Sequence, residues 1–196
     1  MPEGGRVIAG RAKGIRLEVA GTGTRPLSDR VKQALFGSLE AEGALSGGFL
    51  DLFAGTGAAG IEALSRGATH ATFVEDSTKA CALIRSNLQR AALGGGSVVC
   101  RDVARFLAEP TAGNPPYDAV FIDPPYDAHQ LLVRAVEALG EPDAVWLTAQ
   151  AVVVAKHFWR DEPPLRVGTI VRSRQKRFGE TMLSYYTRKA TVDAGL

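Results

Sequence analysis

Apolar residues along this chain recur in two patterns, which alternate from Phe49 onward. Short apolar runs such as "FLDLF" are typical of buried strands, whereas apolar residues three and four positions apart are typical of helices. The alternation predicts, in order, a strand at 49–53, a helix at 58–66, a strand at 70–75, a helix at 77–92, a strand at 97–101, a helix at 103–108, a strand at 118–122, a helix at 128–139 and a strand at 151–156. Such alternation predicts a three-layer α/β domain with a mostly parallel sheet.

The regions on either side follow other patterns. Ser28 or Asp29 can cap a helix whose apolar residues recur at a spacing of four. After His157 the helical periodicity stops, and "LRVGTIVRSRQKRFGETMLSYYTR" predicts two antiparallel strands around a turn at Gly179. This hairpin would close one edge of the sheet.

The first part of the chain, "RVIAGRAKGIRLEV", predicts two short strands around a basic turn from Gly10 to Gly14. Its cations are Arg6, Arg11, Lys13 and Arg16. They fit an ordinary solvated hairpin or an arm that binds nucleic acid. We expect a basic β-hairpin extension at 1–25, one main domain at 26–189 and a tail at 190–196.

Charge is unevenly distributed, although the net formal charge is only +2. Residues 1–32 hold 7 Lys and Arg against 3 Asp and Glu, residues 33–155 hold 7 against 14, and residues 156–189 hold 9 against 3. Basic ends around an acidic middle suggest that the ends meet a polyanion. The four N-terminal cations are the first choice for that contact, and the C-terminal strands around 172–177 are the alternative.

Composition also limits the cellular compartment and the kinds of site that we expect. The two cysteines, Cys81 and Cys100, show neither metal-ligand spacing nor a disulfide framework, and the three histidines are scattered. No apolar stretch is long enough for a signal region or a membrane span. We therefore expect a soluble cytoplasmic protein with no metal and no membrane contact.

A glycine loop follows the first predicted strand of the sheet. "FLDLFAGTGAAG" contains Gly55-x-Gly57-x-x-Gly60 between a strand and a helix, and Glu75 stands twenty residues after Gly55. This context is typical of nucleotide binding, with the acid on ribose hydroxyls, so a dinucleotide is one interpretation. Asp51, however, ends the strand with a carboxylate that suits a cation better than a pyrophosphate. S-adenosylmethionine carries an ammonium and a sulfonium and no phosphate, so we favour it.

Asp102 follows the third strand of the sheet and has two interpretations. It can accept a hydrogen bond from an adenine amine, or it can cap the helix that follows. The sequence supports both equally.

The stretch "YDAVFIDPPYDAH" ends the fourth strand in an unusual way. Prolines lack an N–H group and fix φ, so this exit offers only acceptors, the Asp123 carboxylate and the Pro124 carbonyl, on a stiff frame that includes Pro125. Two acceptors can hold the hydrogens of an exocyclic amine and direct its lone pair to an electrophilic methyl group. Tyr126 offers a face for stacking an extruded base. We expect Asp123 to stay ionised with an ordinary pKa; a rigid turn with a surface tyrosine is the alternative.

Several stretches resemble a known family. "DLFAGTGAAG", "FVED" and "FIDPPYD" resemble the motifs of class I, S-adenosylmethionine-dependent amino-methyltransferases. "RVIAGRAKGIRL", "TRPLSDRVKQALF" and "FGETMLSYY" resemble the RsmD-type methyltransferases, which make N2-methylguanine in small-subunit (16S) ribosomal RNA. The resemblance covers roughly residues 6–187. Leu27 and Gln33 depart from the family pattern, in which Thr and Glu are common.

This resemblance implies roles for individual residues. The expected cofactor residues are Asp51, Phe53, Gly55, Gly57, Glu75, Asp102 and Val103. The expected catalytic residues are Asp123, Pro124, Pro125 and Tyr126. From the distribution of charge, and not from the resemblance, the expected RNA-binding residues are Arg6, Arg11, Lys13, Arg16 and Arg30.

The resulting hypothesis is a methyltransferase that modifies the exocyclic N2 of a guanine in 16S ribosomal RNA, in an assembled particle. An adenine-N6 or DNA amino-methyltransferase is the alternative within the class. A nicotinamide-dependent dehydrogenase and a non-enzymatic RNA-binding module are the alternatives outside it. Because the sheet begins only near Phe49, we also expect residues 1–20 to be removable without loss of the fold or of cofactor binding.

Overall fold

The computed structural model describes residues 5–19, 27–109 and 116–188. Its helices are α1 (Asp29–Ala41), α2 (Ala58–Arg66), α3 (Thr78–Arg90), α4 (Val103–Ala108) and α5 (His129–Gly140). Its strands are β1 (Gly48–Leu52), β2 (His70–Glu75), β3 (Gly96–Cys100), β4 (Tyr117–Ile122), β5 (Leu147–Phe158), β6 (Arg166–Val167), β7 (Ile170–Phe178) and β8 (Thr181–Arg188). The predicted alternation of strands and helices is confirmed.

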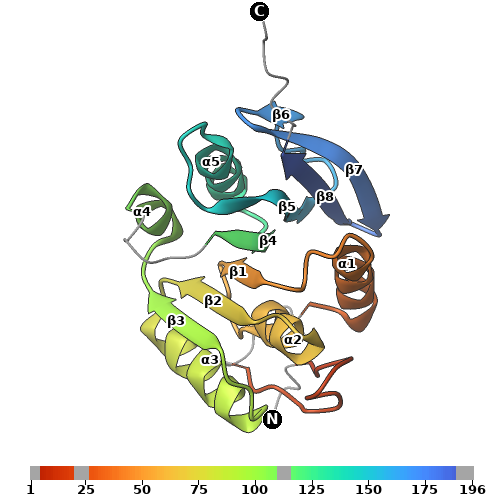
Figure 1. Ribbon diagram of the computed structural model, residues 1–196, viewed down its shortest axis with the longest axis vertical. Helices are drawn as coiled ribbons and strands as arrows, with labels where there is room; N and C mark the ends of the chain where they lie inside the picture. The colour runs from red at the N-terminus through yellow and green to blue at the C-terminus, as the bar shows by residue number, and fades with distance from the viewer. Residues whose placement is uncertain (1–4, 20–26, 110–115, 189–196) are drawn as a thin grey trace, which may run out of the picture.

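The strands form one sheet in the order β3-β2-β1-β4-β5-β8-β7-β6 (Figure 1). β1 to β5 run parallel, and β8, β7 and β6 continue the sheet in antiparallel fashion. The expected C-terminal hairpin is therefore present, with its turn at Gly179, where φ is 61°. The short strand β6, which lies beyond the hairpin, was not predicted. β5 starts earlier than expected, and its first residue, Leu147, pairs with Tyr117.

Helices cover both faces of the sheet, as Figure 1 shows. Successive residues of a strand point to opposite faces, so neighbours in β4 belong to different cores. Ala119 and Phe121 pack with α1, α2 and α3, whereas Val120 and Ile122 pack with α4 and α5. Each face of the sheet thus has its own hydrophobic core beneath helices, and the expected three-layer architecture is confirmed.

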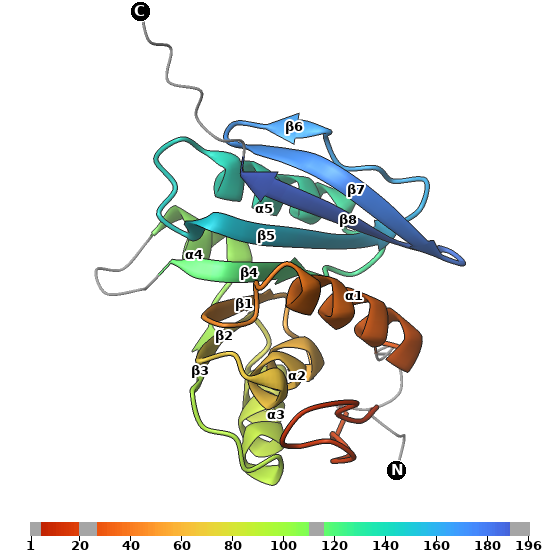
Figure 2. The same ribbon diagram turned by 45° about the vertical axis from the view of Figure 1, so that its right-hand side comes forward.

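The N-terminal segment, residues 5–19, differs from the predicted pair of strands. It forms a hairpin-shaped loop with one isolated antiparallel bridge, between Arg6 and Arg16. Val7, Ala12 and Leu17 are buried in the same core as α1, α2 and α3. Figure 2 shows this loop lying against α2 and α3. Backbone hydrogen bonds join its two arms, as between Val7 N–H and the carbonyl of Ile15 at 2.9 Å, while other backbone groups bind to the helices.

Two polar residues of the helices fasten this segment. Glu62 on α2 is fully buried, and its carboxylate accepts hydrogen bonds from the backbone N–H groups of Ile8 (2.8 Å) and Ala9 (3.0 Å). Asn87 on α3 is also buried and exchanges hydrogen bonds with the backbone of Glu18. These contacts argue against the expectation that residues 1–20 can be removed freely, because removal would leave buried polar groups without partners.

Candidate active site

The glycine loop and the proline-rich loop meet at the carboxyl edge of the sheet. β1 and β4 are neighbours, so the residues that follow them leave the sheet side by side. The backbone N–H of Asp123 donates to the carbonyl of Leu52, at 3.3 Å. Open parallel sheets bind ligands at this edge. The structure therefore brings the two predicted motifs together.

The glycine loop adopts a conformation that requires glycine at several positions. Gly55 and Gly57 have positive φ angles of 55° and 77°, and Phe53 has a φ of 61°. Gly60 is required for another reason, since a Cβ there would lie 2.3 Å from Cε1 of Phe73 on β2. The third glycine thus permits close packing between α2 and the sheet, while the first two permit the sharp turn.

Glu75 supports the glycine loop directly. Its carboxylate accepts hydrogen bonds from the backbone N–H of Gly55, at 2.9 Å, and from that of Ser77, at 3.1 Å. A carboxylate has about four acceptor positions, so both oxygens of Glu75 retain capacity for ribose hydroxyls. Glu75 therefore shapes the loop and still suits the ligand contact that the sequence predicts.

Asp51 is a buried carboxylate beneath the same loop. Only 2% of the residue is exposed, and one oxygen accepts a hydrogen bond from the N–H of Gly60, at 2.8 Å. Burial raises the pKa of Asp51 well above its usual value, and the negative charges of Asp123 and Glu75 raise it further. Three acids that repel one another at one edge favour a cationic ligand. The residues thus fit S-adenosylmethionine, whose ammonium and sulfonium are positive.

Asp102 is a helix cap in this structure. Its side chain accepts a hydrogen bond from the backbone N–H of Arg105, at 2.9 Å, at the start of α4. Val103 is buried in the core beneath α4 and α5. Within the described residues the second carboxylate oxygen of Asp102 has no hydrogen bond, so the capping role leaves it available to a ligand.

The two functional side chains of the proline-rich loop differ in their exposure to solvent. Asp123 is partly buried, with 24% of its side chain exposed, whereas Tyr126 is 41% exposed. The Tyr126 hydroxyl forms a hydrogen bond with Thr181 Oγ1 at 2.8 Å, which ties the loop to the start of β8. The carbonyl of Pro125 accepts a hydrogen bond from the N–H of Ala128, at 2.9 Å, and closes the turn.

Lys156 is a member of this site that the sequence did not indicate. It lies on β5 with 13% of its side chain exposed, and it donates a hydrogen bond to Asp123 Oδ1. Its ammonium also lies 4.8 Å from the centroid of the Tyr126 ring, within the range of a cation–π contact. A single lysine at the end of the apolar run "AVVVA" was the only signal for it.

The pKa of Asp123 corrects another expectation. Burial raises it, and the charge and hydrogen bond of Lys156 offset only part of that rise. Asp123 is thus a better proton acceptor than an exposed aspartate, and its ionisation depends on its lysine partner.

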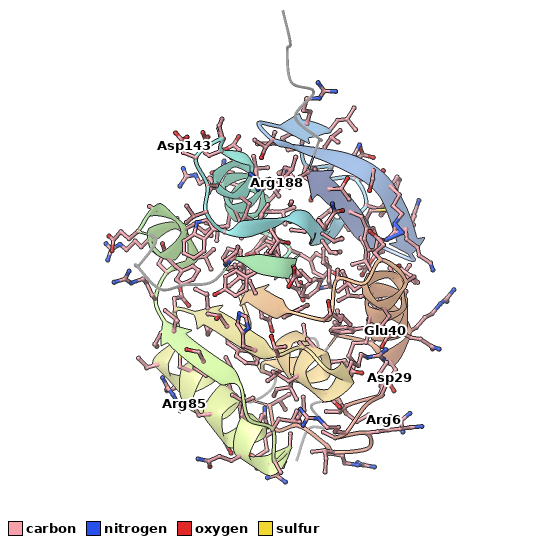
Figure 3. All side chains as sticks on the ribbon, viewed as in Figure 1. Arg6, Asp29, Glu40, Arg85, Asp143 and Arg188 are labelled. Atoms are coloured by element: carbon pink, nitrogen blue, oxygen red, sulfur yellow. The ribbon has the colours of Figure 1, made fainter. Side chains whose placement is uncertain are left out.

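Three of the expected RNA-binding residues have contacts of their own within the protein. Arg6 pairs with Asp29 at 3.1 Å (Figure 3), and Arg11 lies within 3.5 Å of the carbonyl of Leu64 in the last turn of α2. The Arg30 guanidinium lies 5.7 Å from the ring centroid of Phe178 at the end of β7.

The described residues contain no group of three or more His, Cys, Asp or Glu side chains that could hold a metal ion. In the same part of the chain, no helix is long and apolar enough to cross a membrane.

A family model described as "Conserved hypothetical protein 95" matches residues 5–187. The chain belongs to this family. The Bacillus subtilis protein YlbH is 37% identical over 187 residues, which cover 94% of this chain and 99% of YlbH. The "Ribosomal RNA small subunit methyltransferase D" of Escherichia coli K12 is 33% identical over 186 residues, or 94% of this chain and 90% of the relative. The solved structure of Escherichia coli yhhF gives a TM-score of 0.82 at 31% identity, covering 94% of this chain and 98% of that one.

Membership in this family confirms the resemblance to the RsmD-type methyltransferases. The mostly parallel sheet with an antiparallel edge is likewise confirmed by the structural match. The methyltransferase interpretation is therefore favoured over the nicotinamide-dependent dehydrogenase that the glycine loop alone would allow.

Proposed function

We propose that this protein transfers the methyl group of S-adenosylmethionine to the exocyclic N2 of a guanine in 16S ribosomal RNA, in the cytoplasm and on an assembled small-subunit particle. The observation that carries the proposal is the position of Asp123 beside the glycine loop, where an acceptor-only strand exit adjoins an acidic cofactor site. The relatives named as ribosomal RNA methyltransferases support the choice of substrate.

The cofactor residues are those of the glycine loop and the strand ends around it. Glu75 would accept the ribose hydroxyls, Asp51 would face the positive charges, and Gly55 and Gly57 would allow the backbone to approach closely. Phe53, Asp102 and Val103 complete the proposed set around the adenine. When bound, S-adenosylmethionine supplies an electrophilic methyl group.

Asp123 and the carbonyl of Pro124 would hold the two hydrogens of the target amine. A lone pair that is delocalised into a base becomes more available when its N–H groups are held in this way, and correct positioning supplies much of the rate. The methylated nitrogen must lose a proton. The raised pKa of Asp123 makes its carboxylate a suitable acceptor for it.

Tyr126 would stack on the target base, since its exposed ring is held by Thr181 and by Lys156. The rigid turn at Pro125 would keep this ring in place. For the wider RNA we propose phosphate contacts by the predicted cations of the N-terminal segment, Arg6, Arg11, Lys13 and Arg16, and by Arg30.

Nucleoside mass spectrometry of 16S ribosomal RNA is the direct test. Cells that lack the protein should lose one N2-methylguanine, and the wild-type protein should restore it. The variant Asp123→Ala is the matched control, because it removes the amine acceptor and should restore nothing. Loss of an N6-methyladenine instead would favour the alternative within the class, and an unchanged nucleoside profile would contradict the proposal.

A further inference from the structure

A basic and aromatic surface lies at the tip of the C-terminal hairpin, beside α1. It consists of Arg30, Trp159, Arg160, Lys176, Arg177 and Phe178, and we name it the hairpin-tip surface. Figure 2 shows the tip of β7 and β8 projecting beyond the sheet above α1. The surface thus combines residues from three parts of the chain.

Cations and rings alternate across this surface. The Arg177 guanidinium lies 3.9 Å from the ring centroid of Trp159, and that of Arg160 lies 4.8 Å from the same ring. Arg30 and Lys176 each lie 5.7 Å from the ring centroid of Phe178. The four cations are exposed and the two rings are half-buried. Flat rings and guanidinium planes are the groups on which unpaired bases stack.

The cations of this surface differ from others on the same hairpin. Farther along β7, Arg172 pairs with Glu162 and Arg174 pairs with Glu42. Within the described residues, by contrast, the four cations of the hairpin-tip surface form no ion pair. Four acids lie within two residues of these positions in sequence, but Asp29 pairs with Arg6 and Glu162 pairs with Arg172. The four cations outnumber the two other acids, Asp161 and Glu180, so the surface is positive overall. Its cations are available to an anionic partner.

The surface is continuous with the catalytic loop. The Tyr126 hydroxyl forms a hydrogen bond with Thr181 Oγ1. Thr181 pairs with Phe158 of β5 on one side and with Phe178 of β7 on the other. The backbone N–H of Trp159 donates to the carbonyl of Glu180 at 3.0 Å, within the turn that precedes Thr181. A nucleotide stacked on Tyr126 would therefore have its neighbours in the strand beside the hairpin-tip surface.

We propose that the hairpin-tip surface binds the single-stranded RNA that flanks the target guanine. Trp159 and Phe178 would stack on neighbouring bases, while Arg30, Arg160, Lys176 and Arg177 would bind phosphates. This combination of cations and aromatic rings is typical of surfaces that hold single strands. The proposal rests on the proposed function and adds the position and the chemistry of substrate docking.

The test compares two triple variants that each remove three positive charges. The first, Arg160→Gln with Lys176→Gln and Arg177→Gln, changes the hairpin-tip surface. The control, Arg85→Gln with Arg134→Gln and Arg166→Gln, changes exposed arginines on α3, α5 and β6. Figure 3 labels Arg85, which lies on the far side of the molecule from the hairpin. Both variants are first checked for S-adenosylhomocysteine binding by calorimetry, which should match the wild-type protein.

Binding to an assembled small-subunit particle and to a protein-free 16S RNA transcript is then measured over a salt series. The hairpin-tip variant should bind at least about tenfold more weakly, and the slope of log affinity against log salt should fall by about 2, since each lost phosphate contact removes about 0.7 for a single strand. The control should lie close to the wild-type protein. A third variant, Trp159→Leu, should lose at least about fivefold in affinity with an unchanged slope, because stacking carries no charge.

Equal affinity and slope in the two triple variants would overturn the proposal. So would a loss confined to assembled particles with full binding to free RNA, because the partner would then be a protein. Failure of the proposed function itself is seen separately, in the mass spectrometry of cells that carry the wild-type protein.

Discussion

Lys156 donates a hydrogen bond to the Asp123 carboxylate while its ammonium lies 4.8 Å from the centroid of the Tyr126 ring. One cation thus contacts both side chains that we assign to the target base. It lowers the pKa of a carboxylate whose burial raises it. The ionised state of Asp123 therefore depends on a residue from the neighbouring strand β5.

The first prediction concerns this dependence. Lys156→Met removes the cation, so the pKa of Asp123 should rise and the acidic limb of the rate profile should move to higher pH. Lys156→Arg keeps the charge and should leave the limb close to that of the wild-type protein. Single-turnover methyl transfer with saturating RNA, measured from about pH 5 to pH 9, gives both profiles. An unmoved limb in the Met variant would mean that Lys156 does not control Asp123.

The sequence predicted the meeting of the two motifs but not that of Asp123 with Lys156. Motifs that follow parallel strands must lie at one edge, so the glycine loop and the proline-rich loop could be placed together from their local patterns. The contact between Asp123 and Lys156 depends on the register between β4 and β5. Ile122 pairs with Ala155, which brings the next residue of each strand side by side. No local pattern contains that register.

The N-terminal segment was misjudged for a similar reason. An acid such as Glu62 in a short helix is expected at the solvent surface. Here it is fully buried because the N–H groups of Ile8 and Ala9 and the guanidinium of Arg66 satisfy it. Arg66 is four residues away on the same helix, but Ile8 and Ala9 lie more than fifty residues away in sequence, so hydrophobic periodicity carried no sign of these two partners. Gly10 was recognised as a turn residue, but its contact with α2 was not.

The second prediction concerns Asp51. Its raised pKa means that the folded state holds a proton more tightly than the unfolded state does, so stability falls as pH rises from about 3.9, the ordinary value, to the raised pKa. Above the raised pKa, Asp51 is ionised in the folded protein, and its buried charge lowers the free energy of unfolding by a constant amount. Asp51→Asn keeps an acceptor for the Gly60 N–H and removes the charge. It should raise the free energy of unfolding at neutral pH and weaken binding of the cationic cofactor.

Urea unfolding near pH 7 and near pH 4, together with calorimetry for S-adenosylmethionine, checks both parts. The stability difference between Asp51→Asn and the wild-type protein should shrink at the lower pH, where the aspartate is largely protonated. A less stable variant at neutral pH would show that the charge of Asp51 is already compensated in the folded protein.

The third prediction concerns Glu75, which supports the glycine loop and faces the proposed ribose position. Glu75→Ala should weaken S-adenosylhomocysteine binding by about 1.5–3 kcal/mol, the range for hydrogen bonds to charged groups. Glu75→Gln keeps one acceptor oxygen for Gly55 and should lose less. Calorimetry decides the order of the three proteins. An unchanged Kd in the Ala variant would limit Glu75 to a structural role.

The last prediction uses two glycines of the N-terminal segment as a matched pair. Gly10 and Gly14 both have positive φ, at 79° and 90°. A Cβ on Gly10 would lie 1.9 Å from the carbonyl oxygen of Ser65, whereas a Cβ on Gly14 would meet nothing within 4 Å. Alanine at Gly14 therefore costs only the backbone strain of about 1–2 kcal/mol. Alanine at Gly10 adds a clash that must push the segment away from α2.

Gly10→Ala should accordingly lower the free energy of unfolding by at least about 2 kcal/mol more than Gly14→Ala, since the displaced segment withdraws N–H donors from the buried Glu62 carboxylate. Urea unfolding of the two variants gives the difference directly, because they share the same residue change and the same sign of φ. Equal losses would show that the N-terminal segment does not stabilise the domain, and the original expectation that it can be removed would then hold.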